Sequence, residues 1–372
     1  MPAKSTIKTR ILILSDTHGM KLASKIPSTT SVDVLIHCGD LTEHSRLEEY
    51  HASSHLLQSI DAPLKLAIAG NHDLTLDWPA FSAKIAEAKL DLDSEQVINS
   101  FGREGDARRI LESGGGVRLL YQGRHAFTLA NGALLTIYAS PCTPSDGGGA
   151  YQYRRDDGHD FDVGDGGGAV DVFVTHGPPR GVLDRTSGRE RAGCADLFAA
   201  VARARPRLHC FGHIHEGWGG KLVAWREKLA ETPSFFTDID NERSVVVETL
   251  ATLADGKFDD LETSTQKAKR REMYAKEKSC RISCCSGDQH PLVAGKHTLF
   301  VNAAIQDDNG GGEATAQLPW VVDIELPVYS KEDGMEEGKV GMETNQVSGF
   351  KTRRLSGAED ACKMPAAKRR KG

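Results

Sequence analysis

The feature that most constrains this chain is a pattern that recurs five times between residues 7 and 217. A short apolar run rich in Ile, Val and Leu ends close to a glycine, and Asp, Asn or His lies beside it. Such runs are typical of strands that are buried on both faces of a sheet. The runs and their polar residues are Ile7–Leu14 with Asp16 and His18, Val32–His37 with Asp40, Leu64–Ala69 with Asn71, His72 and Asp73, Asp171–Val174 with His176, and Leu208–Phe211 with His213 and His215.

The segments between these runs indicate an α/β fold. Apolar residues at helical spacing predict helices over Leu47–Ile60, Pro79–Lys89 and Cys194–Ala204, and a helix is also expected over Met20–Ile26. Asn131-Gly132 between two apolar runs predicts a hairpin, so part of a sheet is antiparallel. In open α/β sheets, ligands bind at the carboxyl ends of the strands. We therefore expect the polar residues of the five runs to share one site.

His213 and His215 alternate around a single residue after an apolar run. At a strand end, residues i and i+2 point to the same side, so both imidazoles would reach one small volume. A lone pair of this kind is more often explained by surface histidines. The four other strand ends with similar residues make chance a poor explanation here.

The residue types at these strand ends predict a metal centre. Carboxylates with imidazoles suit Mn, Fe, Zn or Co better than Ca or Mg alone. No cysteine is among them, which disfavours a structural zinc site. The set has too many ligands for one ion and about the right number for two that share a bridge, and manganese is the ion most expected to support activity in an assay.

Composition narrows the partners and the compartment. The chain has 372 residues, 39 % hydrophobic and 26 % charged, with a net charge of −6. This charge makes nucleic acid an unlikely partner. The eight cysteines are scattered apart from Cys280, Cys284 and Cys285, so no disulfide framework is expected, and no apolar run is long enough for a signal peptide or a membrane span. A cytoplasmic protein that does not enter the membrane is the expectation.

The second half of the chain has a different residue pattern from the first. Helices are expected over Glu242–Ala254 and Thr263–Glu277, an irregular stretch over Cys280–Gly295, and closing strands over His297–Ala304 and Trp320–Leu326. Residues 330–372 are rich in Gly, Glu and Lys, so we expect a disordered basic tail after a domain spanning 1–329. Two basic clusters in that tail, the pair at 353–354 and the four residues at 368–371, resemble a bipartite nuclear-localisation signal. Solvated charge is the other interpretation, so the nucleus and the cytoplasm both stay open.

Five motifs in order, D-T-H-G, G-D, G-N-H-D-L-T, T-H-G-P-P and F-G-H-I-H-E-G-W-G, resemble the calcineurin-like metallophosphoesterase superfamily. More narrowly they look like the metallophosphoesterase-domain-containing group, whose near relatives resemble class III cyclic nucleotide phosphodiesterases. The resemblance covers Asp16 to His215 and implies a four-layer α/β/β/α sandwich with two mixed β-sheets. Residues 220–296 depart from the pattern and are expected to be an insertion.

The resemblance also implies roles for individual residues. Asp40 would bridge two metals, His72 would lie beside the phosphate, and Asp73 would be a nearby orienting carboxylate. Asn71, His72 and His213 would contact the substrate. The first metal would be held by Asp16, His18 and His215, and the second by Asn71, His176 and His213.

The expected function is that of a dinuclear-metal-dependent phosphodiesterase acting on a small nucleotide-like phosphodiester. A metal-bridging hydroxide would attack the phosphorus, and His72 would stabilise charge or protonate the leaving alkoxide. The alternatives are a phosphomonoesterase, a protein phosphatase, or a metal- or nucleotide-binding scaffold with negligible turnover. The protein phosphatase is disfavoured because the second motif lacks the arginine-bearing block of that branch. Oligomeric state stays open.

Several residues also have a structural interpretation. His72 could support a ligand instead of touching substrate, and Asp73 could cap the following helix. His37 is expected to pack within its strand. Arg154, Arg155 and Arg180 could pair with phosphate but more simply carry solvated charge, and Cys280, Cys284, Cys285 and His290 match no known zinc spacing.

Overall fold

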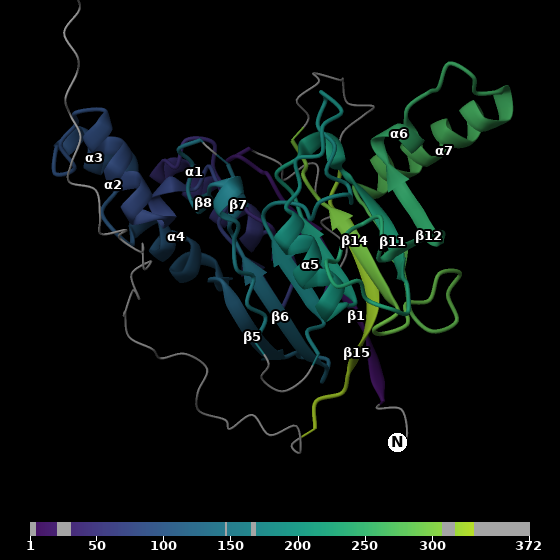
Figure 1. Ribbon diagram of the computed structural model, residues 1–372. Helices are drawn as coiled ribbons and strands as arrows, with labels where there is room; N and C mark the ends of the chain where they lie inside the picture. The colour runs from purple at the N-terminus through teal and green to yellow at the C-terminus, as the bar shows by residue number, and fades with distance from the viewer. Residues whose placement is uncertain (1–4, 21–30, 146, 165–168, 307–316, 331–372) are drawn as a thin grey trace, which may run out of the picture. The chain divides into compact units, whose positions relative to one another are not determined.

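Two mixed β-sheets form the centre of the fold (Figure 1). The computed structural model describes residues 5–20, 31–145, 147–164, 169–306 and 317–330. The first sheet has the order β13-β15-β1-β2-β3-β4, parallel from β1 to β4 and antiparallel between β1 and β15. Its strands are β13 (Cys280–Ser283), β15 (Trp320–Pro327), β1 (Thr6–Leu14), β2 (Val34–His37), β3 (Leu64–Ala67) and β4 (Val117–Leu119).

The second sheet has the order β12-β11-β14-β10-β9-β6-β5. Its central strands from β14 to β6 are parallel, and antiparallel strands flank them on both sides. Its strands are β12 (Ile239–Thr249), β11 (Gly219–Trp225), β14 (His297–Asn302), β10 (Leu208–Phe211), β9 (Val172–Thr175), β6 (Leu134–Ser140) and β5 (Gly123–Thr128). A separate small pair is formed by β7 (Thr143–Pro144) and β8 (Gln152–Tyr153).

The helices lie outside the two sheets. The α-helices are α1 (Leu47–Gln58), α2 (Trp78–Glu87), α3 (Glu95–Phe101), α4 (Asp106–Gly115), α5 (Ala195–Ala204), α6 (Leu250–Leu253) and α7 (Leu261–Glu277). Three 3-10 turns are η1 (Leu74–Leu76), η2 (Arg155–Asp157) and η3 (His215–Gly217). No helix in the described ranges is long and apolar enough to span a bilayer.

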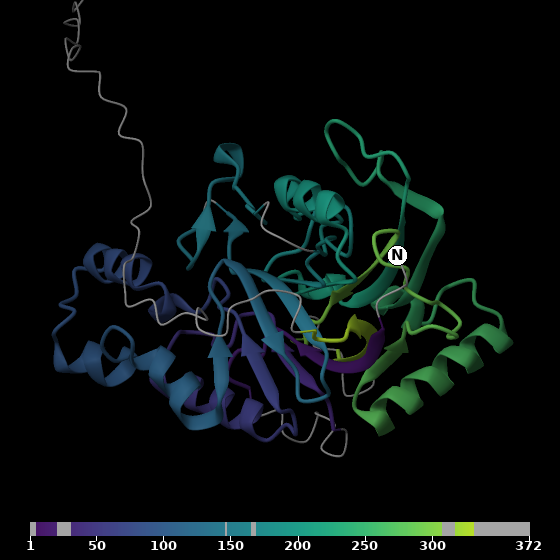
Figure 2. The ribbon, with the colours of Figure 1, turned by 90° about the horizontal axis from the view of Figure 1, so that it is seen from below.

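Side-chain alternation along β1 explains the layers. Ile11 and Ile13 belong to the core between the two sheets, while Leu12 and Leu14 belong to a second core beneath α1 and α4. A third core packs α5 against the outer face of the second sheet, so α1 and α4 lie opposite α5 (Figure 2). The result is the expected four-layer α/β/β/α sandwich.

The carboxyl ends of both sheets meet at one edge. The peptide of Ser15, just after β1, donates to Ala303 O at 3.0 Å and accepts from Ile305 N at 3.1 Å, just after β14. Because β1, β2 and β3 are parallel, as are β14, β10 and β9, all their ends lie at this edge. The five polar strand ends of the sequence are therefore brought together.

Two sequence expectations in the second half are wrong. Glu242–Ala254 was expected to be a helix, but the strand β12 extends to Thr249 and only the short α6 follows. In the β-branched run Val245–Val247, Val245 and Val246 pair with β11, and this sheet partner outweighs helical spacing. The expected irregular stretch from Cys280 begins with β13, which pairs in parallel with β15.

The stretch 220–296, expected as an insertion, contributes most of β11, all of β12 and all of β13 to the two sheets. Helix α7 was expected and is present, beginning after the cap Asp260, whose side chain accepts from Thr263 N. Residues 1–329 group into one compact unit. The expected helix over Met20–Ile26 and the expected disordered tail fall almost entirely outside the described residues.

Candidate metal centre

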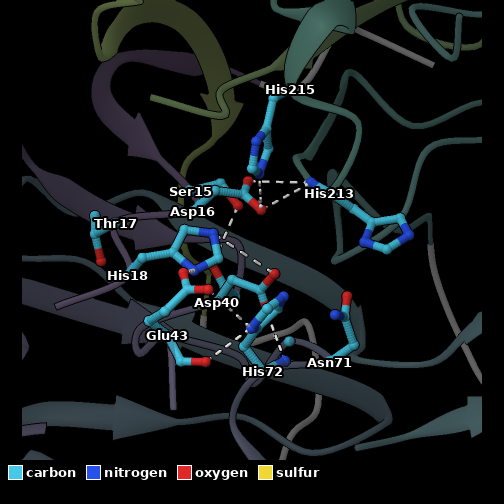
Figure 3. A network of polar contacts seen from close by, with 12 residues as sticks. Ser15, Asp16, Thr17, His18, Asp40, Glu43, Asn71, His72, His213 and His215 are labelled. Carbon is cyan, nitrogen blue, oxygen red and sulfur yellow. Dashed lines mark hydrogen bonds and ion pairs between the residues drawn. The ribbon is translucent and has the colours of Figure 1, made fainter. Parts of the chain in front are cut away.

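The seven residues expected to bind metal lie together at the shared strand edge, and all of them except His176 are labelled in Figure 3. They form two groups, and within each trio one ligand atom per residue lies within 4.8 Å of the others. Asn71 joins the second group, because its Oδ1 lies 3.0 Å from Nε2 of His176. The first group is Asp16, His18 and His215, and the second is Asp40, His176 and His213.

Four of these residues have a left-handed backbone that is uncommon outside glycine. The φ angles are 56° at Asp16, 46° at His18, 53° at Asp40 and 68° at His213. Such conformations cost about 1–3 kcal/mol each and cluster at functional sites. In each case the chain leaves a strand and turns sharply, which aims the side chain across the sheet edge.

His213 and His215 lie just after a strand end, as expected, but the alternation of a strand does not continue to them. Strand β10 ends at Phe211, His213 is left-handed, and His215 begins η3. Gly212 lies so close to Asp16 and Ser15 that a Cβ there would overlap their side chains. The His213 peptide N donates to both Asp16 oxygens, at 3.1 and 3.0 Å. The two rings therefore diverge and join different groups (Figure 3).

The first group surrounds a buried carboxylate. Nε2 of His215 lies 3.4 Å from Oδ1 of Asp16, which is fully buried. Burial alone would raise the pKa of Asp16, but the hydrogen bond from His215 and the nearby imidazoles hold it well below its usual range. Burial lowers the pKa of His18, and neither ring nitrogen of His18 has a hydrogen-bond partner among the described residues.

The second group has a defined imidazole orientation. Nδ1 of His176 donates to Cys38 O at 2.9 Å, so the neutral ring carries its lone pair on Nε2, which lies 3.2 Å from Oδ2 of Asp40. Burial alone would lower the pKa of His176, but the ion pair and hydrogen bond with Asp40 raise it to about 9. Burial lowers the pKa of His213 to about 4, so that ring is neutral at pH 7.

These residues fit divalent cations. Nε2 of His176, Oδ1 of Asn71 and Oδ2 of Asp40 are all acceptors that face one another, an arrangement that needs a cation or a proton. The buried nitrogens of His18 likewise lack a partner among the described residues. Oδ2 of Asp40 lies 3.9 Å from Nε2 of His18 and so faces both groups. Carboxylate, amide and imidazole together suit borderline divalent ions.

His72 lies at the mouth of this centre. Its side chain is 37 % exposed and its ring centroid lies 4.9 Å from that of His18. The His72 peptide N donates to Oδ1 of Asp40 at 2.8 Å, and Nδ1 lies 2.9 Å from Glu43 O. A carbonyl only accepts, so the proton is on Nδ1 and Nε2 is left for the centre.

Asp73, expected as an orienting carboxylate near the phosphate, uses its carboxylate for internal hydrogen bonds. Its fully buried carboxylate accepts from Leu41 N at 3.1 Å, Thr42 N at 3.0 Å, Thr42 Oγ1 at 2.8 Å and Gly70 N at 2.8 Å. Its side chain does not cap η1 either. Burial and the charge of Asp40 raise the pKa of Asp73 to about 7. Asp73 thus joins the loop that carries Asp40 to the loop that carries His72.

Glu43 is a site residue that the sequence reasoning missed. Its Oε2 lies 2.8 Å from Nδ1 of His18, and Glu43, His18 and His72 form a third group of possible metal ligands. Its only sequence signal was its place three residues after Asp40. Among the described residues no such group includes a cysteine, which favours packing roles for Cys280, Cys284 and Cys285.

Two of the arginines that could pair with phosphate, Arg155 and Arg180, have different surroundings. Arg155 donates to Gly193 O at 3.0 Å and to Ala192 O at 2.8 Å, so it supports a loop. Arg180 is exposed and follows the Thr175–Pro179 motif. The expected packing role of His37 agrees with its contacts, because both of its ring nitrogens lie against Thr17 Oγ1 and Gly39 N.

A family model described as "Calcineurin-like phosphoesterase" matches residues 9–217, more than half of the chain. The chain belongs to the calcineurin-like phosphoesterase family. This calcineurin-like phosphoesterase is 33 % identical over 215 residues to human "Metallophosphoesterase domain-containing protein 1", covering 57 % of this chain and 62 % of that protein. That name is the one carried by the group its motifs resemble.

The chain is also similar to two other proteins. The chain is 33 % identical over 218 residues to "Probable rhamnogalacturonate lyase C" of Emericella nidulans, over 58 % of this chain and 18 % of that protein. The chain therefore spans less than two thirds of these relatives. A purple acid phosphatase from yellow lupin shares 12 % identity at a TM-score of 0.33, over 60 % of this chain and 40 % of that one.

Proposed function

We propose that this calcineurin-like phosphoesterase is a dinuclear-metal-dependent phosphodiesterase that hydrolyses small nucleotide-like phosphodiesters. The observation that carries the proposal is the pair of ligand groups on either side of Asp40, with the partly exposed His72 at their mouth. A binding scaffold would need neither the second group nor an accessible imidazole beside it.

We assign Asp16, His18 and His215 to the first ion, Asn71, His176 and His213 to the second, and Asp40 to both. When bound, two such ions polarise phosphoryl oxygens and supply a water acidified enough to attack near neutral pH. The neutral amide of Asn71 adds no charge, which keeps the second position more electrophilic than a carboxylate would. Manganese is the ion we expect to support activity best, with Fe, Zn and Co as alternatives.

The chain's own residues define the remaining steps. His72 holds one proton on Nδ1 through Glu43 O, so a second proton on Nε2 would face the substrate. That Nε2–H can donate to a phosphoryl oxygen or pass its proton to the leaving alkoxide. Asp73 does not reach the substrate in this proposal. It positions the two loops, because its oxygens are used by four internal donors.

A panel of substrates tests the proposal. We expect manganese-loaded protein to hydrolyse bis-p-nitrophenyl phosphate and cyclic nucleotides faster than p-nitrophenyl phosphate. Faster hydrolysis of the monoester would replace the diesterase by a phosphomonoesterase. No turnover of either ester with Mn, Fe, Zn or Co would leave only the scaffold, and Asp40→Ala provides the metal-deficient control.

A further inference from the structure

Glu43 lies between two imidazoles of the proposed centre. Its carboxylate approaches His18, with Oε2 2.8 Å from Nδ1, while Oε1 is 3.9 Å from Nδ1 of His72. Its main-chain oxygen lies 2.9 Å from Nδ1 of His72. One residue therefore faces the Nδ1 atoms of both rings, through its carboxylate for His18 and through its peptide for His72 (Figure 3).

The two nitrogens of His18 have different surroundings. Nε2 faces Asp40, whose Oδ2 lies 3.9 Å away, whereas Nδ1 faces Glu43. An imidazole that binds a cation through Nε2 keeps its proton on Nδ1. The carboxylate of Glu43 is then the acceptor nearest to that proton. The contact already has hydrogen-bond length, although its alignment falls short of a hydrogen bond.

Glu43 is itself fixed by the start of α1. Glu49 Oε1 accepts from Glu43 N and from His44 N, each at 3.1 Å, and Glu49 Oε2 accepts from Arg46 N at 2.8 Å. The peptide that faces His72 is thus held by hydrogen bonds to Glu49, which do not depend on the Glu43 side chain. This separation lets the two contacts of Glu43 be tested independently.

We propose that Glu43 is a positioning residue that fixes the tautomer of both imidazoles, His18 through its carboxylate and His72 through its main-chain carbonyl. With both protons on Nδ1, both Nε2 atoms face the centre. Carboxylates that hold a metal-binding histidine in this way typically change metal affinity by about 10–100-fold. The inference rests on the proposed metal centre and adds the residue that sets its proton arrangement.

A third ion held by Glu43, His18 and His72 is the competing interpretation. It would require His18 to bind cations through both ring nitrogens, which demands loss of both of its protons. It would also require Nδ1 of His72 to give up its contact with Glu43 O at 2.9 Å, or the ring to bind through Nε2. The positioning role needs neither change.

Metal titration of half-site variants tests the proposal. His213→Ala leaves the first group complete, and His215→Ala leaves the second. In the His213→Ala protein we expect Glu43→Ala to weaken binding of one Zn or Mn ion by about 10–100-fold, and Glu43→Gln, which keeps an acceptor, to weaken it less. In the His215→Ala protein Glu43→Ala should change affinity by less than about threefold, because the Glu43 carboxylate faces His18 of the first group.

Controls separate this role from a loss of structure. Glu48→Ala removes a neighbouring carboxylate that is 78 % exposed and should change neither affinity. Melting temperatures should match those of the parent proteins. In the cobalt-loaded His213→Ala protein, the hyperfine-shifted Nδ1–H signal of His18 should exchange with solvent faster after Glu43→Ala.

The outcomes are distinct. Selective weakening of the first site supports the proposal. The positioning role of Glu43 would be overturned if Glu43→Ala weakened both sites equally, weakened neither, or removed a third ion. None of these results would contradict the two-ion centre. A wild-type protein that binds no divalent ion would overturn the proposed function and this inference together.

Discussion

A histidine's role in this protein depends on what its two ring nitrogens contact. His37 uses both nitrogens internally, against Thr17 Oγ1 at 3.0 Å and Gly39 N at 3.2 Å, so none is left for a ligand. His176 uses only Nδ1, against Cys38 O, and directs Nε2 into the centre. Both residues follow or end buried strands, and their sequence surroundings alone do not separate them as clearly.

The proposed role of His72 predicts a loss of rate without a loss of metal. His72→Ala should lower kcat by about 10²–10⁴-fold, the usual contribution of a positioned acid or base. Metal content should stay at the wild-type value, because the ring belongs to neither of the two principal groups. Kinetics and elemental analysis on the same sample check this, and a metal-free or unfolded variant would contradict the assignment.

The raised pKa of His176 predicts that protons compete with the second ion. Because Asp40, and to a smaller extent Asp16, raise its pKa to about 9, the ring must lose a proton before Nε2 binds a cation. Affinity in the His215→Ala variant should therefore fall by about tenfold per pH unit as the pH drops below that value, with release of about one proton. Calorimetry in buffers of different ionisation enthalpy measures this, and pH-independent binding between neutral pH and pH 9 would argue against it.

At the scale of elements, loops between strands and helices carry the site, and buried hydrogen bonds hold them together. Asp73 is the clearest case, because its carboxylate accepts from both the loop after β2 and the loop after β3. Neither its position in G-N-H-D nor its spacing from Leu74 distinguished this role from a substrate contact or a helix cap. The partners lie about thirty residues away in sequence, and only folding brings them close.

Asp73→Asn should therefore weaken both ions and the fold. An amide group would direct N–H donors toward peptide N–H groups, which leaves buried donors unpaired and costs about 1–3 kcal/mol. Denaturant unfolding and metal titration measure the two effects. Asp93→Asn, a surface change at a side chain that is 85 % exposed, should alter neither by more than about 0.5 kcal/mol. Loss of activity with full stability and full metal content would instead place Asp73 in the chemistry.

The elements most readily predicted were those whose burial is continuous. Strands β2, β9 and β10 and the last four residues of β1 are buried throughout, and the sequence indicated these strands within a few residues. The β12 region was misjudged because its exposed, charged start lacks strand alternation, and its partner β11 was not foreseen. Strands at the edge of a sheet take their conformation from a neighbour, so local spacing carries less information about them.

At the scale of the whole molecule, the site depends on the two sheets staying packed. Trp320 on β15 of the first sheet is fully buried, and its ring lies 5.4 Å from that of Trp218, which follows the His215 motif. A Cβ at Gly220 on β11 would overlap Trp320, so this contact crosses between the two sheets.

Trp320→Ala should separate the sheets near the site. A cavity of this size costs about 3–5 kcal/mol of unfolding free energy, and the first ion should bind more weakly because the His215 loop loses its support. Phe236→Ala, at a side chain that is 74 % exposed, is the matched control and should change stability by less than about 0.5 kcal/mol. Unchanged stability of Trp320→Ala would show that the two sheets pack independently of this contact.

The sequence by itself determined which residue types end the buried strands, and therefore the α/β class, the family resemblance and the seven expected metal ligands. The class comes from the spacing of neighbouring residues, which local geometry converts into strands and turns, and the choice of the seven ligands comes from the motif resemblance. The tertiary structure decided which atoms meet: the His213 peptide contacts Asp16 although 197 positions separate them. It alone brought Glu43 to the site and made the Asp73 carboxylate a link between two loops, because contacts between distant segments depend on how the chain packs.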